Sequence, residues 1–304
     1  MSDNNRQGIH VLLVEDNPGD VRLLQELLRD GPSAAAFTLE HCADLEAGLE
    51  RPDSVSPSIV LLDLGLPDSQ GLDTFRLMRQ RFPDVPIVVL SGETDEAVAL
   101  GAVQEGAEDF LLKQDLNPRL LARTLRYSIE RHELKEQLQY LATHDPLTGT
   151  YNRRYFNSSI EAELARSQRY SHPIGFLMID VNRFKEINDR HGHQIGDAVL
   201  KQVAGFLVSQ LRAVDLVVRY GGDEFLLVLP ETNGEADEVA ARLRRGSSEL
   251  TQAHPALDAP ITLSVGASHW DPQSSQSITE VLAEADERMY EDKRRRGQGV
   301  QEVD

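Results

Sequence analysis

The chain has 304 residues, of which 40% are apolar and 27% charged, and its formal net charge is -19 at pH 7. At about 150 residues per domain this length predicts two domains, and the acidity argues against a nucleic-acid partner. The single cysteine, Cys42, excludes an internal disulfide framework and favours a cytoplasmic location. The polar N-terminus lacks a signal core, and no apolar run reaches the roughly 20 residues that span a bilayer, so we expect no membrane span.

The first half of the chain alternates strand-like and helix-like segments from residue 9 to about 126. The runs IHVLLV, FTLE, IVLLD, IVVLS and DFLLK predict short strands, and the central ones are apolar on both faces. Between them, segments such as DVRLLQELLRD and LDTFRLMRQRF carry apolar residues three and four apart, which is typical of helices. Five such units predict an α/β domain with a doubly wound, parallel five-stranded sheet.

Polar side chains follow these strands, where a parallel sheet brings all strand ends to one edge. Glu15 and Asp16 follow the first strand, while Asp63 ends the third, Ser91 the fourth and Lys113 the fifth. Carboxylates meeting at one edge repel one another unless a cation lies between them, and hard oxygen ligands favour Mg²⁺. A lysine and a hydroxyl at the same edge suit an oxyanion attached to one carboxylate. The pattern therefore predicts a phosphorylatable aspartate beside one Mg²⁺.

The stretches VEDNPGD, LLDLGLPDSQG, VLSG and DFLLK resemble the receiver domain of bacterial response regulators over residues 9–126. The resemblance implies a cognate histidine kinase as partner and Asp63 as the phosphoacceptor. It also implies a metal set and a phosphate-sensing set with an aromatic switch, namely Glu15, Asp16 and Asp63, and Ser91, Lys113 and Phe110. The family usually has proline after the lysine, whereas Gln114 here argues against a cis peptide bond and predicts a differently shaped loop.

Residues 117–141 lack glycine, and their one proline, Pro118, suits the start of a helix. We expect a long helix in which residues 127–142 connect two domains. A 4-3-4-3 spacing typical of a coiled-coil seam runs through Leu120, Thr124, Tyr127, Arg131, Leu134, Leu138 and Leu141. Thr124 and Arg131 weaken this seam, which favours a marginal dimer contact. In the alternative interpretation, the segment is only the last helix of the first domain and packs on that domain's sheet. We expect this packing for the first half of the helix.

The second half begins with the turn-rich THDPLTGTYNRRYF, which leads into a helix. IGFLMID predicts a buried strand ending at Asp180, and FKEINDRHG and IGDAVLKQVAGFLVSQL predict helices. DLVVRY and EFLLVLP flank Gly221 and Gly222, which indicates a hairpin and a sheet that is at least partly antiparallel. A helix around 235–250, the strand ITLSVGA and a helix around 278–294 complete a second α/β domain.

The hairpin RYGGDEF places two glycines directly before two acids. Glycines at a hairpin tip permit positive φ and let a ligand approach the backbone. If the hairpin lies beside the strand that ends at Asp180, Asp180 and Asp223 form a carboxylate pair for a divalent metal. Two Mg²⁺ ions shared with a triphosphate are common in nucleotidyl transfer. Taken alone, the hairpin is equally typical of a solvated turn.

Four stretches, IDVNRFKEINDRHGHQIGD, RAVDLVVRYGGDEF, THDPLTGTYNRR and ITLSVGA, together resemble the GGDEF family of diguanylate cyclases over residues 143–300. The resemblance implies a mixed-sheet fold like nucleotidyl-cyclase and polymerase palm domains. It also implies that two GTP condense to cyclic di-GMP and two pyrophosphates, with two Mg²⁺ per GTP or Mn²⁺ in their place. Because one domain binds one GTP, it implies a homodimer.

The resemblance implies that Asp180 and Asp223 are catalytic metal ligands, and that Glu224 lies near the reacting 3′-hydroxyl, with its role as base left open. It implies that Asn188 and Asp197 read guanine. The other implied substrate-binding residues are Phe184, Gly221, Gly222 and the triphosphate anchors Lys185 and Lys293, with Lys185 also among the catalytic groups. Which of Arg294, Arg295 and Arg296 replaces the family's usual arginine is left open.

Arg212 and Asp215 form an RxxD motif shortly before the glycines. It matches the family's inhibitory product site, where the arginine clasps phosphate and the aspartate holds a guanine edge. The alternative is a surface ion pair near a strand start. His191 and His193 are interpreted as a loop feature rather than a metal site, because no further Cys or His lies nearby.

The sequence thus predicts a phosphorylation-regulated diguanylate cyclase that acts as a dimer and is inhibited by its product. One alternative is a catalytically silent module that binds cyclic di-GMP or GTP, against which the intact Asp180, Asp223 and Glu224 argue. Another is a structural signalling scaffold. The partner kinase, the sign of the phosphorylation effect and the resting oligomer are not fixed by the sequence.

Overall fold

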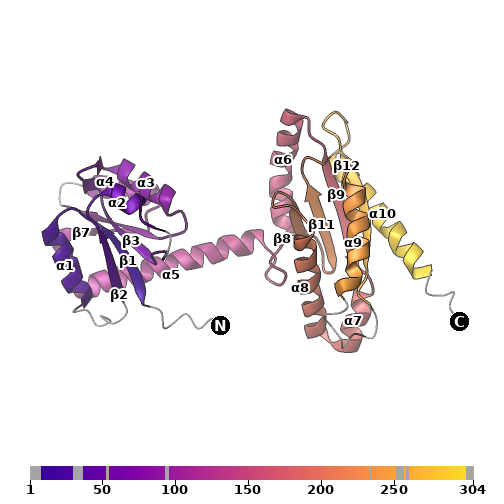
Figure 1. The fold of residues 1–304 in the computed structure, drawn as a ribbon, viewed down its shortest axis with the longest axis horizontal. Helices are drawn as coiled ribbons and strands as arrows, with labels where there is room; N and C mark the ends of the chain where they lie inside the picture. Colours follow the sequence, from indigo (N-terminus) through magenta and orange to yellow (C-terminus); the bar gives the residue numbers. More distant parts are fainter. Residues whose placement is uncertain are drawn as a thin grey trace. The chain divides into compact units, whose positions relative to one another are not determined.

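The computed structural model describes residues 8–29, 37–52, 55–92, 96–232, 234–250, 257 and 260–298. The chain divides into two compact units, Met1–Gln137 and Leu138–Asp304 (Figure 1). The division falls inside the segment 127–142 that the sequence suggests as a connector. Within the described ranges, no helix combines the length and apolar content needed to cross a membrane.

The first unit is built on a parallel five-stranded sheet in the order β2-β1-β3-β6-β7, which confirms the predicted doubly wound fold. Its strands are β1 (Ile9–Val14), β2 (Phe37–Cys42), β3 (Ile59–Asp63), β6 (Ile87–Ser91) and β7 (Asp109–Leu112). Its helices are α1 (Pro18–Arg29), α2 (Leu45–Leu49), α3 (Leu72–Arg81), α4 (Glu96–Gln104) and α5 (Pro118–Thr143). A small ribbon of β4 (Gly65–Leu66) and β5 (Ser69–Gln70) and the 3₁₀ helix η3 (Lys113–Asp115) complete it. Lys113 therefore begins η3 instead of ending β7.

Apolar side chains of the central strands alternate between two clusters on opposite faces of this sheet. On one face Leu13 packs in a cluster with Leu24 of α1 and Leu121 of α5. On the other face Leu12 packs in a cluster with Phe75 of α3 and with residues of α2 and α4. Period-two alternation thus buries both faces of the strands and leaves the strand ends for polar side chains.

The second unit has a five-stranded sheet in the order β12-β9-β11-β10-β8, and its mixed character confirms the prediction. Its strands are β8 (Tyr151–Asn152), β9 (Ile174–Val181), β10 (Leu216–Arg219), β11 (Glu224–Leu229) and β12 (Leu263–Trp270). Strand β9 is antiparallel to both β11 and β12, while β10 is antiparallel to β11 and parallel to β8. β9 continues one residue past the predicted end at Asp180, because Val181 still pairs with Leu263 of β12.

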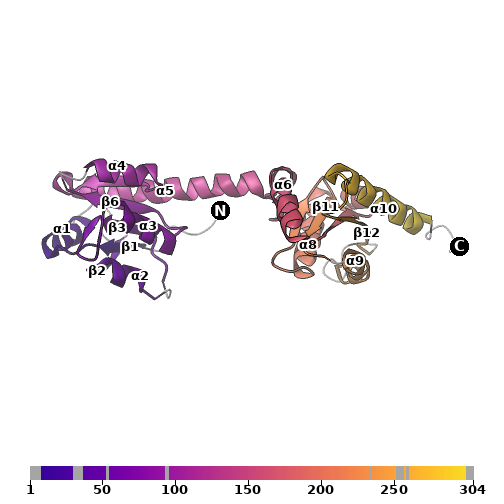
Figure 2. The same cartoon turned by 90° about the horizontal axis from the view of Figure 1, so that it is seen from above.

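Helices cover both faces of this second sheet (Figure 2). They are α6 (Arg153–Tyr170), α7 (Phe184–His191), α8 (His193–Ser209), α9 (Ala236–Leu250) and α10 (Ile278–Gln298). Leu177 of β9 packs with α8 and α9, while Phe176 packs with α6 and α10. The buried Trp270, the only tryptophan in the chain, ends β12 and donates from Nε1 to the carbonyl of Gln276. The α7–α8 turn and the β10–β11 hairpin remain outside these layers.

Helix α5 does not present a continuous seam. Thr124 is buried against the first unit, and the Arg131 side chain pairs with Glu108, whose own side chain is only 5% exposed. His132 and Lys135 also approach the same carboxylate, at 3.1 and 3.8 Å. Thr124 and Arg131 therefore interrupt the seam, as expected, and the burial of Thr124 agrees with the predicted packing of the helix's first half on its own domain.

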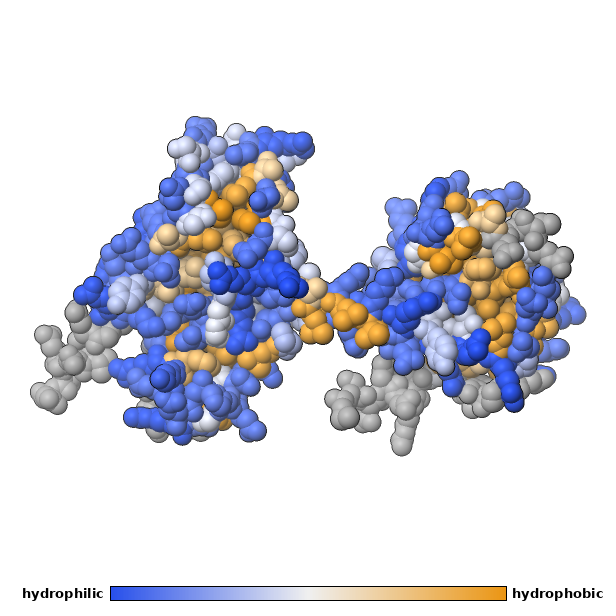
Figure 3. All heavy atoms as spheres, turned by 180° about the vertical axis from the view of Figure 1, so that it is seen from behind, coloured by the Kyte–Doolittle hydropathy of each residue, from blue (hydrophilic) through white to orange (hydrophobic). Residues whose placement is uncertain are grey.

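Leu120 is half-buried against the core of the first unit, and the remaining seam positions on α5 carry exposed apolar side chains. Tyr127, Leu134, Leu138 and Leu141 are 62%, 56%, 59% and 52% exposed. Figure 3 shows apolar atoms gathered on the surface of this helix. We name these four residues the α5 apolar face.

Candidate functional site

Three carboxylates converge at the carboxyl edge of the first sheet. One carboxylate oxygen each from Glu15, Asp16 and Asp63 lies within 4.8 Å of the others. Glu15 is fully buried, and this burial, together with the charge of Asp63, raises its pKa to about 7 in spite of Lys113. Carboxylates that lie this close, one of them buried with a raised pKa, are the surroundings that a bound cation relieves. The residues present therefore fit the predicted Mg²⁺.

Lys113 joins this cluster from the start of η3. Its Nζ lies 2.5 Å from Asp63 Oδ2, 2.7 Å from Glu15 Oε2 and 2.8 Å from Asp20 Oδ2. Burial alone would lower the pKa of Lys113, but the hydrogen bonds to these carboxylates leave it above its ordinary value. Asp20, in the first turn of α1, was not predicted, since it follows a turn and not a strand.

The other predicted receiver residues lie on neighbouring strands. Ser91 is buried at the end of β6, next to β3, and its hydroxyl donates to the Gly92 carbonyl at 3.1 Å. Phe110 is half-buried in β7 against the cluster of α3 and α4. Gln114 lies within η3, and no peptide bond of the described residues is cis, as expected without the family's proline.

The β10–β11 hairpin brings three acids to one end of the second sheet. Glu224 pairs in register with Asp180 of β9, so both side chains project from the same face. The carbonyl of Asp223 accepts a hydrogen bond from the Val181 N–H at 3.2 Å, which fixes the hairpin tip beside β9. The backbone pairing thus places Asp223 next to Asp180, as the sequence suggests.

The two glycines at the hairpin tip differ in their surroundings. Neither Gly221 nor Gly222 uses the positive φ that glycine permits at a hairpin tip. A Cβ on Gly221 would lie 2.7 Å from Glu224 Oε2, whereas one on Gly222 would meet nothing within 4 Å. The carboxylate of Glu224 thus folds back over Gly221 and would have to shift to admit a side chain there, while the exposed Gly222 leaves open space beside it.

The electrostatics of this end of the sheet are strongly negative. Burial and then the Asp180 charge raise the pKa of Asp223, and burial with Asp180 and Asp223 raises the pKa of Glu224. Asp180 is 5% exposed, and its Oδ1 has no hydrogen-bond partner, while Oδ2 lies 2.8 Å from Lys293 Nζ of α10. A buried carboxylate oxygen without a partner fits a divalent cation here. The three acids do not approach one another as closely as those of the receiver cluster.

The predicted guanine-reading residues lie on α7 and α8. Asn188 is half-buried on α7, and its Oδ1 is buried without a partner. Asp197 is exposed on α8 and directly follows the buried Gly196. Gly196 was not among the predicted site residues. Phe184 and Lys185 begin α7, with Phe184 half-buried and Lys185 exposed. The structure therefore gathers these four predicted side chains on one helix pair.

An ion pair that the sequence did not reveal ties the hairpin to the start of the second unit. Arg219 Nη1 lies 2.9 Å from Asp145 Oδ1, and both side chains are largely buried. The same guanidinium donates to the Gly222 carbonyl from Nη2 at 2.8 Å. Asp145 also accepts from the N–H and hydroxyl of Thr148 in the turn DPLT. This turn therefore positions the hairpin tip through a single arginine.

The structure does not distinguish among the three arginines that follow Lys293. Arg295 forms an exposed pair with Glu291 at 3.3 Å, and Arg294 is exposed. The side chain of Arg296 lies outside the described residues.

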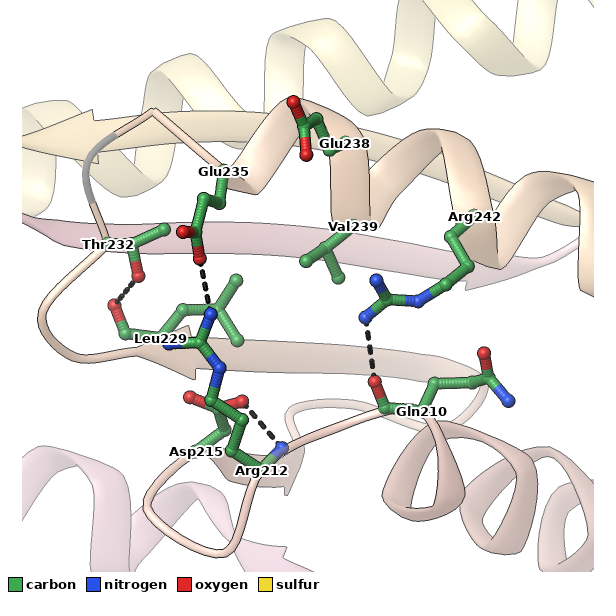
Figure 4. Close-up of a pocket in the computed structure, with 9 residues that line it drawn as sticks. All are labelled: Gln210, Arg212, Asp215, Leu229, Thr232, Glu235, Glu238, Val239 and Arg242. Atoms are coloured by element: carbon green, nitrogen blue, oxygen red, sulfur yellow. Dashed lines mark hydrogen bonds and ion pairs between the residues drawn. The ribbon is translucent and has the colours of Figure 1, made fainter.

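A cavity of about 270 Å³ adjoins the RxxD motif (Figure 4). Arg212 Nη2 lies 2.5 Å from Glu235 Oε2, and its backbone N–H donates to Asp215 Oδ2 at 2.9 Å. Arg242 of α9, which was not predicted, lines the same cavity and donates to the Gln210 carbonyl at 2.8 Å. Figure 4 shows the two guanidinium groups with Val239 between them. Two cations beside a half-buried aspartate suit a phosphorylated ligand with a polar base.

Comparison with known proteins gives two family matches. The family described as "Diguanylate cyclase, GGDEF domain" matches residues 142–298, and "Response regulator receiver domain" matches residues 11–125. Response regulator PleD of Caulobacter vibrioides is 29% identical over 301 residues, which are 94% of this chain and 64% of that protein. Diguanylate cyclase DosC of Escherichia coli is 36% identical over 177 residues, 58% of this chain and 36% of DosC. The chain thus spans less than two thirds of these relatives' length.

Among solved structures, the coiled coil and GGDEF domain of DgcB from Caulobacter crescentus, in complex with c-di-GMP, is similar with a TM-score of 0.50. The sequences are 28% identical, and the match covers 58% of this chain and 93% of that one.

Proposed function

This chain belongs to the GGDEF family of diguanylate cyclases and carries a receiver domain before that domain; we propose that it condenses two GTP into cyclic di-GMP under the control of phosphorylation at Asp63. The observation that supports this most directly is the group of Asp180, Asp223 and Glu224 at one end of β9 and β11. A domain that only bound nucleotide would not need three clustered acids, two of which, Asp223 and Glu224, have pKa values raised by burial.

Guanine is read by the helix pair α7–α8. The buried Oδ1 of Asn188 and the carboxylate of Asp197 are acceptors, and guanine offers the N1–H and the 2-amino group as donors. Adenine lacks this donor pattern, so it would leave a buried acceptor unpaired. Phe184 lines the same place from the start of α7.

The triphosphate lies between the hairpin and the lysines. When bound, Mg²⁺ held by Asp180 and Asp223 neutralises phosphate charge and favours attack by the 3′-hydroxyl. Lys293 leaves Asp180 for the triphosphate, joined by Lys185, and Gly222 provides the open space that the ribose and α-phosphate occupy. Glu224 stands near the 3′-hydroxyl, whose proton is lost as its oxygen bonds to the α-phosphorus and pyrophosphate departs.

Each domain holds one GTP, so the reaction needs two domains facing each other. The α5 apolar face supports a second copy of the chain as the partner, because four large apolar side chains stay exposed on one helix. Phosphorylation of Asp63 would give Lys113 a phosphoryl oxygen in place of the carboxylates it now binds. The rearranged receiver then controls how often two cyclase domains meet.

The activity itself is tested by incubating purified protein with GTP and Mg²⁺, with and without acetyl phosphate or beryllofluoride. We expect cyclic di-GMP and pyrophosphate on chromatography, in amounts that change with the phosphoryl donor. Absence of cyclic di-GMP under both conditions would rule out the enzyme.

Replacing Leu134 and Leu138 together by lysine should weaken dimer formation at least tenfold. Each leucine that is buried in the dimer contributes up to about 1.5–3 kcal/mol to the free energy of association, and lysine removes this contribution. Sedimentation velocity measures the dimer, and turnover at low protein concentration should fall with it and recover at high concentration. Leu77→Lys, on an exposed leucine of α3 that is 43% exposed, is the matched control. An unchanged monomer–dimer equilibrium would exclude this face.

Arg242→Ala should raise the cyclic di-GMP concentration for half-inhibition by about ten- to a hundredfold, since a charge-assisted hydrogen bond to phosphate contributes about 1.5–3 kcal/mol. Initial rates at increasing product concentration measure it. Arg245→Ala removes the same charge from α9 outside the cavity and should leave inhibition unchanged. Equal effects of the two variants would mean that general charge, not this cavity, binds the product.

A further inference from the structure

Gly196 occupies a helical position where glycine has no backbone reason to be. It is buried near the start of α8 and does not have positive φ. Alanine would favour the helix here by about 1 kcal/mol. The reason for glycine must therefore lie in its surroundings.

Those surroundings are the predicted base-reading residues of α7. A Cβ on Gly196 would lie 1.9 Å from Asn188 Oδ1, 2.9 Å from Asn188 Cγ and 3.2 Å from Phe184 Cζ. Real Cβ atoms do not come within 3.0 Å of other heavy atoms, so Asn188 would have to move. The missing side chain is the space that the amide occupies.

The position of that amide matters because its oxygen has no hydrogen-bond donor in the structure. Asn188 Oδ1 is buried and unpartnered, and Asp197 is the residue directly after Gly196. The glycine thus fixes the distance between an acceptor on α7 and an acceptor on α8. A guanine base, with its N1–H and 2-amino donors, spans two such acceptors.

We propose that Gly196 is a specificity-determining positioning residue: by lacking a side chain, it lets Asn188 lie deep enough for Oδ1 to accept from the guanine 2-amino group while Asp197 accepts from the same base edge. The proposal rests on the guanine site of the proposed function. It selects guanine over hypoxanthine, which keeps N1–H but has no 2-amino group.

The test measures binding without turnover, using 3′-deoxy-GTP and 3′-deoxy-ITP, which lack the attacking hydroxyl. Calorimetric titration of the full chain should show the wild type preferring the guanine nucleotide by about tenfold, the value of one hydrogen bond. In Gly196→Ala this preference should fall to nearly one, through weaker binding of 3′-deoxy-GTP. Gly205→Ala, also in α8 but with nothing within 4 Å of its Cβ, should keep the wild-type preference.

Two further results bear on the mechanism. In an Asn188→Ala background, adding Gly196→Ala should change binding less than twofold, because the clashing amide is gone. Thermal melting of Gly196→Ala within a few degrees of Gly205→Ala shows that the fold is intact. Retention of the nucleotide preference in Gly196→Ala, or additive effects of the two substitutions, would overturn the proposal.

The results of this binding test can be distinguished from those of the activity assay for the proposed function. If the wild type binds 3′-deoxy-GTP selectively, Gly196→Ala loses this preference, and no cyclic di-GMP forms, the role of Gly196 is supported and the proposed cyclase activity is contradicted. A wild type that makes cyclic di-GMP but binds both nucleotides equally overturns the role of Gly196 alone.

Discussion

Asp223→Asn should lower cyclic di-GMP formation by about a thousandfold or more, while binding of cyclic di-GMP stays within about twofold of wild type. Asparagine removes the charge that the proposed divalent metal needs. The hairpin should keep its shape, because only the backbone carbonyl of Asp223 bonds to Val181. Asp223 is not among the residues that line the cavity around Arg212 and Arg242, so the cavity keeps its lining.

The substitution should not weaken the fold. The folded-state pKa of Asp223 is raised, so its charged form costs stability as the pH rises through that value, and the neutral asparagine avoids this cost. In metal-free buffer near neutral pH we expect a melting temperature equal to or above that of wild type. A lowered one would mean that the loss of activity reflects unfolding.

Product chromatography and calorimetry with cyclic di-GMP measure the two effects separately. Asp237→Asn removes the same charge from a side chain that is 74% exposed on α9, and should leave turnover unchanged. Turnover by Asp223→Asn at the wild-type rate would contradict the assigned role. A silent wild type that still binds cyclic di-GMP would favour the binding module over the enzyme.

Asp63→Asn should lower phosphoryl incorporation from acetyl phosphate by at least about a hundredfold, because an amide cannot form the acyl phosphate. Intact-mass measurement gives the fraction of protein phosphorylated. Asp73→Asn, at a side chain that is 78% exposed on α3, is the matched control and should be labelled like wild type. Labelling of Asp63→Asn at the wild-type level would place the acceptor elsewhere.

The same variant tests the link between the two domains. Acetyl phosphate should change the rate of cyclic di-GMP formation in wild type and leave the rate of Asp63→Asn unaltered. An equal response in both proteins would show that the phosphoryl donor acts outside the receiver site.

Most of the fold could be predicted because its strands and long helices have strong apolar periods. β1, β3 and β6 lie where the apolar runs are, and α8 and α10 follow the helical spacing. The two-residue strands β4, β5 and β8 and the five-residue helix α2 were not predicted, because two strand residues or little more than one helical turn are too short to contain a period.

The acidic sites could be predicted where backbone topology alone fixes them. Asp63 follows a parallel strand, and Asp223 adjoins a hairpin beside β9. Partners across the fold could not be predicted, because Arg219 and Asp145 are 74 residues apart and Lys113 and Asp20 are 93 apart. The sequence also did not show that the Glu224 carboxylate lies over Gly221, because that contact depends on the side-chain conformation.

Trp270 makes the second unit separately observable. It is the only tryptophan of the chain, and it is buried at the end of β12. Its emission therefore comes from the cyclase domain alone, and shifts to longer wavelength only when that domain opens. Circular dichroism sums both domains, so their two unfolding transitions can be told apart in one sample. The native chain thus contains a built-in optical probe for whether the receiver changes the stability of its neighbour.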